Sequence, residues 1–265
     1  MFSKKVISNI LAVILFTALI VFVIGACLSA LYAETSIRPH KENYFIAGED
    51  DIKFHVSLKV NLLYPSATGI YFAYSEKAFW NIYDNSAPFR EFNHNPEVFY
   101  MLEQNNNIFG NSDLWIIDHI ILAPYEHISN GRDGEASRGL DRYYGEIQIS
   151  IGEIWNSGIR AKVFNFYKTS SKNKDIDQYI GHYEGEFFIR RLCSNDPNIS
   201  FHKLYIKGGT DDNFKRGWVE SGLIVTLLSD IIQPKLFINV FSGYCESLID
   251  YNKKDTQIRA GLLFM

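Results

Sequence analysis

Apolar and polar side chains alternate along most of the chain. From Ile52 to Leu62 every second residue is apolar, and Lys53 and Lys59 stand among the intervening polar positions. Because successive side chains of a β-strand point to opposite faces, this pattern predicts a strand with one apolar face and one polar face. Comparable segments predict twelve strands, at about 44–47, 52–62, 69–76, 97–103, 113–129, 138–151, 158–167, 178–190, 199–207, 214–228, 235–244 and 256–265.

Two kinds of all-β protein produce such a pattern. A soluble sandwich buries its apolar faces between two sheets, whereas a bacterial outer-membrane barrel turns them to lipid and closes an even number of strands. The even strand number and the aromatic content, with 16 Tyr and 20 Phe, favour the barrel. The predicted fold class is therefore an all-β, 12-stranded antiparallel transmembrane β-barrel over residues 34–265.

The N-terminus has a different pattern from the rest of the chain. A basic start precedes an apolar run, residues 6–32, which ends in small residues up to Ala33. This arrangement is typical of a secretory signal peptide over residues 1–33, which directs the protein out of the cytoplasm. Two alternatives remain open, an uncleaved membrane anchor and a lipoprotein cleavage box at 24–27 that ends in Cys27.

Strand order predicts which connections lie outside the membrane. If both termini are periplasmic, the connections at 77–96, 130–137, 168–177 and 245–255 are external, and they include most of the longest ones. Cys193 then lies in a periplasmic turn and Cys245 at the external rim, separated by a membrane thickness of roughly 25 Å. A disulfide needs Cα atoms within about 7 Å, so both thiols are expected to be free.

Charge and motifs exclude several functions. The formal net charge of −4 gives no electrostatic reason to expect a nucleic acid partner. The chain shows no zinc-ligand spacing, phosphate-binding loop or nucleotide fingerprint. Three acidic residues on polar strand faces are expected to form a structural network in the lumen: Glu184, Glu186 and Glu220.

The segment YEHISNGRDGEASRGLD, residues 125–141, brings together a histidine, a serine and an aspartate. In a hairpin centred on Gly134, His127 stands opposite Asp141 at about 5 Å, and Ser129 lies roughly 6–7 Å along the same face. That face is expected to be the lipid-facing one, because it continues the odd-numbered apolar positions Trp115, Ile117, Ile121, Ala123 and Tyr125 and, on the returning strand, Ile147, Ile149 and Ile151.

Polar groups on a lipid-facing wall are unfavourable unless they serve a function. The group of His127, Ser129 and Asp141 is therefore a candidate catalytic site. The alternative is that residues 125–141 rise above the bilayer, where polar groups carry no such penalty. His119 shares the same parity at a deeper position, where a contact between subunits is expected.

These residues resemble the signature of outer membrane phospholipase A, the bacterial phospholipase A1 family. The resemblance runs from about residue 43 to the end of the chain. The matching residues are Phe79-Trp80, Ser86-Ala-Pro88-Phe89-Arg90-Glu91, His127-Ile-Ser129-Asn130-Gly131-Arg132, Ser137-Arg138, Asp141-Arg142-x-Tyr144 and Ser242-Gly243-Tyr244-x-Glu246-Ser247-Leu248-Ile249-Asp250-Tyr251-Asn252.

The resemblance implies a calcium-dependent phospholipase of the A1/A2 type in the bacterial outer membrane, active as a homodimer. It makes Ser129 the nucleophile, His127 the general base and Asp141 the group that orients the imidazole. Gly131 would supply an oxyanion-hole amide, with calcium-bound water as the second donor. We keep a passive small barrel, either a channel or an adhesin scaffold, as the alternative, and a soluble secreted hydrolase as the third interpretation.

The resemblance also implies a set of calcium ligands. They are the Arg132 carbonyl, the Ser137 hydroxyl and the Ser86 carbonyl of the partner subunit, all oxygen donors of the kind calcium prefers. Three positions depart from the family. Asp141 replaces an asparagine, Lys172 aligns with an acidic residue that helps to bind calcium, and Met265 follows Phe264 where the family ends on an aromatic residue.

Overall fold

The structure is a computed structural model that describes the chain from residue 37 onward, with short gaps. The described ranges are 37–63, 68–107, 115–151, 157–192, 199–211, 213–227 and 234–264. The predicted signal peptide and its alternatives, together with Cys193 and Met265, lie outside the described residues. Cys245 is a free thiol, as expected.

The chain forms two parts, Met1–Arg38 and Pro39–Met265, and the second part is the barrel. A short strand, β1 (Ile37–Pro39), lies at the junction between them. Among the described residues no helix is long and apolar enough to span a bilayer.

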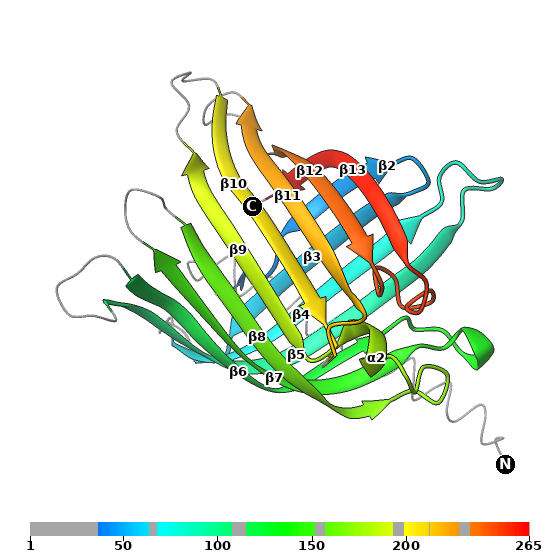
Figure 1. The fold of residues 1–265 in the computed structure, drawn as a ribbon, viewed down its shortest axis with the longest axis horizontal. Helices are drawn as coiled ribbons and strands as arrows, with labels where there is room; N and C mark the ends of the chain where they lie inside the picture. Colours follow the sequence, from blue (N-terminus) through cyan, green and yellow to red (C-terminus); the bar gives the residue numbers. More distant parts are fainter. Residues whose placement is uncertain are drawn as a thin grey trace, which may run out of the picture. The chain divides into compact units, whose positions relative to one another are not determined.

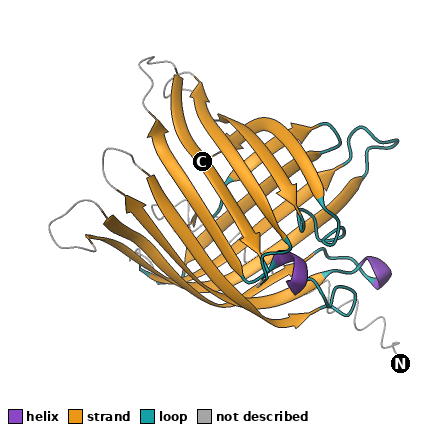
Figure 2. Cartoon of the chain, in the orientation of Figure 1, coloured by secondary structure: helices purple, strands orange, loops and turns teal. Residues whose placement is uncertain are grey.

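Twelve strands in the described residues form a closed antiparallel ring, which confirms the predicted fold class (Figures 1 and 2). Each pairs with its sequence neighbours, and the ring closes where the first and last strands, β2 and β13, pair along Asn43–Gly48 and Arg259–Phe264. The strands are β2 (Asn43–Gly48), β3 (Ile52–Asn61), β4 (Gly69–Trp80), β5 (Phe89–Asn107), β6 (Trp115–Ser129), β7 (Gly139–Ile151), β8 (Ser157–Thr169), β9 (Tyr183–Leu192), β10 (Ile199–Thr210), β11 (Gly217–Leu227), β12 (Lys235–Gly243) and β13 (Asp255–Phe264).

Side chains alternate between the outer wall and the interior of the barrel. On β4, Phe72 is 40% exposed, whereas its neighbours Tyr71 and Ala73 are 2% and 0% exposed. The outer wall carries many such exposed apolar and aromatic side chains, which is the pattern expected of a surface solvated by lipid. The alternation therefore gives the barrel an apolar exterior and a mixed interior.

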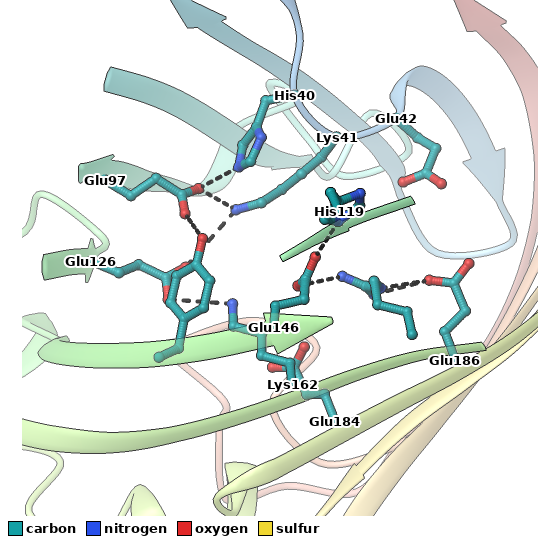
Figure 3. A network of polar contacts seen from close by, with 12 residues as sticks. His40, Lys41, Glu42, Glu97, His119, Glu126, Glu146, Lys162, Glu184 and Glu186 are labelled. Atoms are coloured by element: carbon teal, nitrogen blue, oxygen red, sulfur yellow. Dashed lines mark hydrogen bonds and ion pairs between the residues drawn. The ribbon is translucent and has the colours of Figure 1, made fainter. Parts of the chain in front are cut away.

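Ion pairs cross the interior of the barrel (Figure 3). Glu97 contacts His40 at 2.9 Å and Lys41 at 2.7 Å, and Glu126 contacts Lys162 at 3.5 Å. Buried charges are tolerated when they are paired and hydrogen-bonded. The lumen also holds a cavity of about 750 Å³, lined largely by such charged groups.

The expected network of lumen carboxylates is confirmed. Each acidic side chain meets a cation from another strand: Glu184 meets Arg142 at 3.6 Å, Glu186 meets Arg160 at 2.9 Å, and Glu220 meets Lys207 at 3.0 Å. Charged side chains on the inward faces of different strands thus pair with one another in the lumen.

Two predicted boundaries were wrong. β4 and β5 extend to Trp80 and from Phe89, so the connection at 77–96 shrinks to 81–88. The predicted strand at 178–190 begins instead with a short helix, α2 (Asp177–Ile180), which ends at Gly181, where φ is 75°. In the first case, strand pairing continues through residues 77–80 and 89–96, where apolar and polar residues do not alternate as the prediction required.

Irregular pairing in β6 reverses part of the predicted orientation. The register with β7 shifts between Ile117 and His119 and again between Ala123 and Glu126. Each bulge inserts an extra residue and so changes which face the following side chains occupy. The prediction that Ile121, Ala123 and His119 face lipid was wrong.

The buried side of β6 shows where these residues lie instead. Ile121 and Ala123 are 5% and 3% exposed and belong to an inner apolar cluster, whereas Leu122 between them is 58% exposed. His119 lines the lumen cavity, and its Nε2 atom lies 3.3 Å from Glu146. A subunit contact through His119 is thereby ruled out by its position.

Candidate active site

His127 and Asp141 are joined across the ladder between β6 and β7. The two residues are register partners, as predicted, and the Nδ1 atom of His127 lies 2.6 Å from Oδ1 of Asp141. Both side chains are partly exposed, at 35% and 23%. The imidazole is therefore held through one nitrogen, and its Nε2 atom is the nitrogen that remains for chemistry.

The second bulge of β6 places this pair on the outer wall. After the bulge, Tyr125 is 44% exposed, while Glu126 is 1% exposed and Ile128 lines the lumen cavity. His127 and Ser129 alternate with these inward residues, so they share the outward face of Tyr125. The predicted outward direction of His127 and Ser129 is confirmed. The first bulge of β6 turns the odd-numbered residues inward, and the second bulge turns them outward again.

Tyr125 is a site residue that the sequence argument missed. Its hydroxyl donates a hydrogen bond of 3.0 Å to the same Asp141 oxygen that contacts His127. Sequence reasoning treated Tyr125 only as an apolar, lipid-facing side chain. Its position two residues before His127 on the same strand face was the available signal, because side chains at that spacing are neighbours.

Ser129 stands between two neighbouring strands on the same face. Its register partners are His94 on β5 and Gly139 on β7. In the part of the chain that is described, no hydrogen bond engages the Ser129 hydroxyl. The structure thus brings Ser129 to the same wall as His127 and Asp141, with its hydroxyl available to a substrate.

A loop, residues 130–138, follows Ser129. Asn130 is 3% exposed. Its side-chain Nδ2 donates to the Ala136 carbonyl at 2.8 Å, and its Oδ1 accepts a hydrogen bond from the backbone amide of Arg138 at 2.9 Å. Gly131 adopts a positive φ of 62°, which glycine reaches without steric penalty. Buried Asn130 therefore fixes the loop that carries Gly131.

The expected calcium donors can be tested by their chemistry. Within the described ranges, no hydrogen bond engages the carbonyl oxygens of Arg132 and Ser86 or the hydroxyl of Ser137, so these atoms are open to a ligand. All three are oxygens, which fits calcium. No group of three His, Cys, Asp or Glu residues that could hold a metal occurs in the described residues. The three expected donors are all neutral oxygens.

Lys172 lies beside these donors. Its ammonium group forms an ion pair with Glu135 of the short 3-10 helix η1 (Gly134–Ala136), two residues before Ser137. The hydrogen bond from Lys172 lowers the pKa of the Glu135 carboxyl. The ion pair with Lys172 thus occupies the Glu135 carboxylate, which is the acidic group nearest to Ser137 in the sequence.

A second polar group on the outer wall was not predicted. The Tyr74 hydroxyl lies 2.8 Å from both Glu76 Oε2 and His94 Nδ1, and the latter two atoms are 3.3 Å apart. We call Tyr74, Glu76 and His94 the β4–β5 cluster. None of these three residues lies in the motif segments quoted from the sequence.

Comparison with known proteins shows similarity to phospholipases A1. The family model described as Phospholipase A1 matches residues 16–264. Phospholipase A1 from Escherichia coli strain K12 is 29% identical over 227 residues, which cover 82% of this chain and 70% of that protein. A putative phospholipase A1 from Neisseria meningitidis serogroup B is 27% identical over 81% of this chain and 54% of its own length.

Solved structures show the same architecture. The outer membrane phospholipase A of Escherichia coli superposes with a TM-score of 0.72 at 25% identity, over 86% of this chain and 94% of that one. The Salmonella typhi outer membrane phospholipase dimer with bound calcium has a TM-score of 0.73 at 24% identity, over 88% and 93% of the two chains. At that identity, the second likeness concerns the fold alone.

Proposed function

The chain belongs to the phospholipase A1 family, and we propose that it hydrolyses acyl ester bonds of glycerophospholipids with Ser129 as nucleophile. The observation that carries the proposal is the 2.6 Å contact between His127 and Asp141 beside Ser129 on the outer wall. That wall of an outer-membrane barrel is where acyl chains of lipids are found.

His127 acts as the general base in this mechanism. Asp141 holds Nδ1, so Nε2 accepts the proton of the Ser129 hydroxyl while the oxygen attacks the ester carbonyl carbon. The protonated imidazole then gives this proton to the oxygen of the breaking ester bond, and the lysophospholipid leaves with a free hydroxyl. Water, activated by the same imidazole, hydrolyses the acyl-enzyme and releases a fatty acid.

Gly131 stabilises the negative charge that develops on the carbonyl oxygen. Its amide hydrogen is not engaged by another described residue, and the turn that carries it is fixed by Asn130. Calcium, held by the Arg132 carbonyl and the Ser137 hydroxyl, would add positive charge near this oxygen when bound. Preorganised donors of this kind are often the largest contribution to such a reaction.

A homodimer completes the proposed calcium site. Ser86 lies exposed in the connection 81–88, at a positive φ of 67°. Its carbonyl could reach a neighbouring barrel, which makes the Ser86 carbonyl of the partner subunit the third ligand. The related Salmonella typhi enzyme is a dimer with bound calcium, and we propose the same assembly here.

The ion pairs across the lumen do not support the alternative of a channel. They link charges from strands that are not ladder partners, as Lys203 on β10 does with Glu42 beside β2 at 3.1 Å. A passive barrel would conduct ions or bind a ligand without turning over lipid. We therefore propose the enzyme in preference to the pore.

Ser129→Ala tests the proposal directly. We expect it to abolish release of fatty acid from phospholipid in detergent micelles while the barrel still folds, as judged by heat-dependent mobility in gel electrophoresis. Ser242→Ala is the matched control, because Ser242 is a half-buried serine on β12 whose hydroxyl lies 2.9 Å from that of Thr256. Full turnover by Ser129→Ala would exclude Ser129 as the nucleophile.

A further inference from the structure

Glu76, His94 and Ser129 form a row across three neighbouring strands. Glu76 on β4 is the register partner of His94 on β5, and His94 is the register partner of Ser129 on β6. All three occupy outward positions, so consecutive side chains in the row stand about 5 Å apart at Cβ. Ser129 thus has an imidazole beside it on β5 as well as His127 on its own strand.

The β4–β5 cluster fixes one nitrogen of the second imidazole. Nδ1 of His94 lies 2.8 Å from the Tyr74 hydroxyl and 3.3 Å from Glu76. The side chains of His94 and Glu76 are 37% and 30% exposed on a wall that faces lipid. Such polar groups in a membrane are unfavourable and are usually kept for a function.

The other nitrogen of His94 points toward the turn at Gly131. A Cβ atom placed on Gly131 would lie 3.0 Å from Nε2 of His94. Nε2 therefore borders the amide that we propose as an oxyanion donor. A substrate carbonyl attacked by Ser129 would have its oxygen in this region.

We propose that His94 is a second catalytic histidine, which donates a hydrogen bond from Nε2 to the ester carbonyl oxygen as negative charge develops there. The Tyr74 hydroxyl shares its hydrogen between Glu76 and Nδ1 of His94, so Nδ1 accepts and the neutral ring carries its own proton on Nε2. Tyr74 and Glu76 are therefore positioning residues for His94. This inference rests on the proposed function, because it assumes that Ser129 attacks the ester. No bond to His94 forms or breaks in this step.

The contacts favour a donor over a second base. His127 has the closer carboxylate, at 2.6 Å from Asp141, whereas Glu76 is 3.3 Å from His94. The base position is thus already filled by the better-held imidazole. A hydrogen-bond donor beside Gly131 would stabilise the negative charge on the ester carbonyl oxygen, which neither the Ser129 hydroxyl nor His127 does.

Substitution at His94 separates the two roles. His94→Phe keeps a ring but removes the donor, and we expect kcat to fall about 10²–10³-fold with little change in KM. His94→Gln can donate from its amide but cannot act as a base, so it should recover most of the loss. His182→Phe is the matched control, because the His182 imidazole hydrogen-bonds to the Phe164 carbonyl and packs against the rings of Phe164 and Phe166, away from the triad.

The proposal is overturned by either of two results. One is that His94→Phe leaves kcat unchanged, and the other is that His94→Gln is as inactive as His94→Phe. If Ser129→Ala is inactive while His94→Phe retains full activity, this inference fails and the proposed function stands. If Ser129→Ala remains active, the proposed function itself fails.

A double-mutant cycle tests the positioning role of Glu76. We expect Glu76→Ala to lower kcat in the otherwise unchanged protein and to have no further effect when His94 is already phenylalanine. Additive losses would show that Glu76 acts independently of His94. Both variants are assayed as full-length protein with calcium and a phospholipid of defined acyl chains.

Discussion

The Asp141 carboxylate receives two hydrogen bonds at one oxygen, from the Tyr125 hydroxyl at 3.0 Å and from His127 at 2.6 Å. Because His127 and Asp141 come from neighbouring strands of one hairpin, the relation is fixed by a single ladder. The orientation of the imidazole thus depends on β6 and β7 and not on a distant loop.

Asp141→Asn should keep substantial activity. The asparagine oxygen can still accept the hydrogen bond from His127, and the family has asparagine at this position. We expect a decrease in kcat of about fivefold, because a hydrogen bond to a charged group is stronger than one to a neutral group by roughly 1 kcal/mol. Complete loss of ester hydrolysis would show that this chain has come to depend on the negative charge.

Tyr125→Phe should weaken catalysis without unfolding the barrel. The change removes one donor to Asp141, and a hydrogen bond worth about 1 kcal/mol corresponds to roughly a fivefold decrease in kcat. Tyr143→Phe is the control, because Tyr143 is an exposed tyrosine on β7 whose ring packs at a tilt against that of Tyr167. Equal effects of the two substitutions would argue against a specific role for Tyr125.

Removal of calcium with a chelator should stop lipid hydrolysis. The neutral oxygens of Arg132 and Ser137 are the donors that support this expectation. Activity that persists in excess chelator would show that the metal site was wrongly carried over from the family.

Lys172→Asp should lower the calcium concentration needed for half-maximal activity. The substitution removes an ammonium group from Glu135 and adds a carboxylate, the kind of ligand calcium prefers. A calcium titration of the initial rate measures the change. Lys174→Asp, in the same loop, controls for the added negative charge, and an equal shift in that variant would contradict a local effect at Lys172.

Glu246→Ala should destabilise the barrel. Glu246 is 5% exposed and pairs with Lys53 and Arg259, so its removal leaves buried cations without their partner. Loss of one member of a buried pair decreases the free energy of unfolding by about 3–5 kcal/mol. Urea unfolding in lipid vesicles measures this change.

An exposed ion pair provides the control for Glu246. Asp250→Ala removes a contact of 2.7 Å to Lys253, whose side chain is 74% exposed. Surface pairs contribute about 0–1 kcal/mol, so we expect little change in stability. A comparable loss in both variants would mean that burial is not the cause.

The sequence alone determined the barrel and the central hairpin. Alternation predicted an outward face for Asp141 on β7 and an inward face for Glu146, and the turn around Gly134 fixed His127 opposite Asp141. Both follow from local rules, because side-chain direction has a period of two residues and a hairpin sets its own register. The family motif then gave those positions chemical roles as hypotheses.

Only the tertiary structure decided the rest of the wall. The bulges in β6 turned Ile121 and His119 inward, and the register between β5 and β6 put His94 beside Ser129. A bulge changes parity without a clear sequence signal, since it depends on how the strand fits its two neighbours. Contacts between side chains on different strands depend on the register of all the strands in the closed ring. The sequence of a single strand does not determine that register.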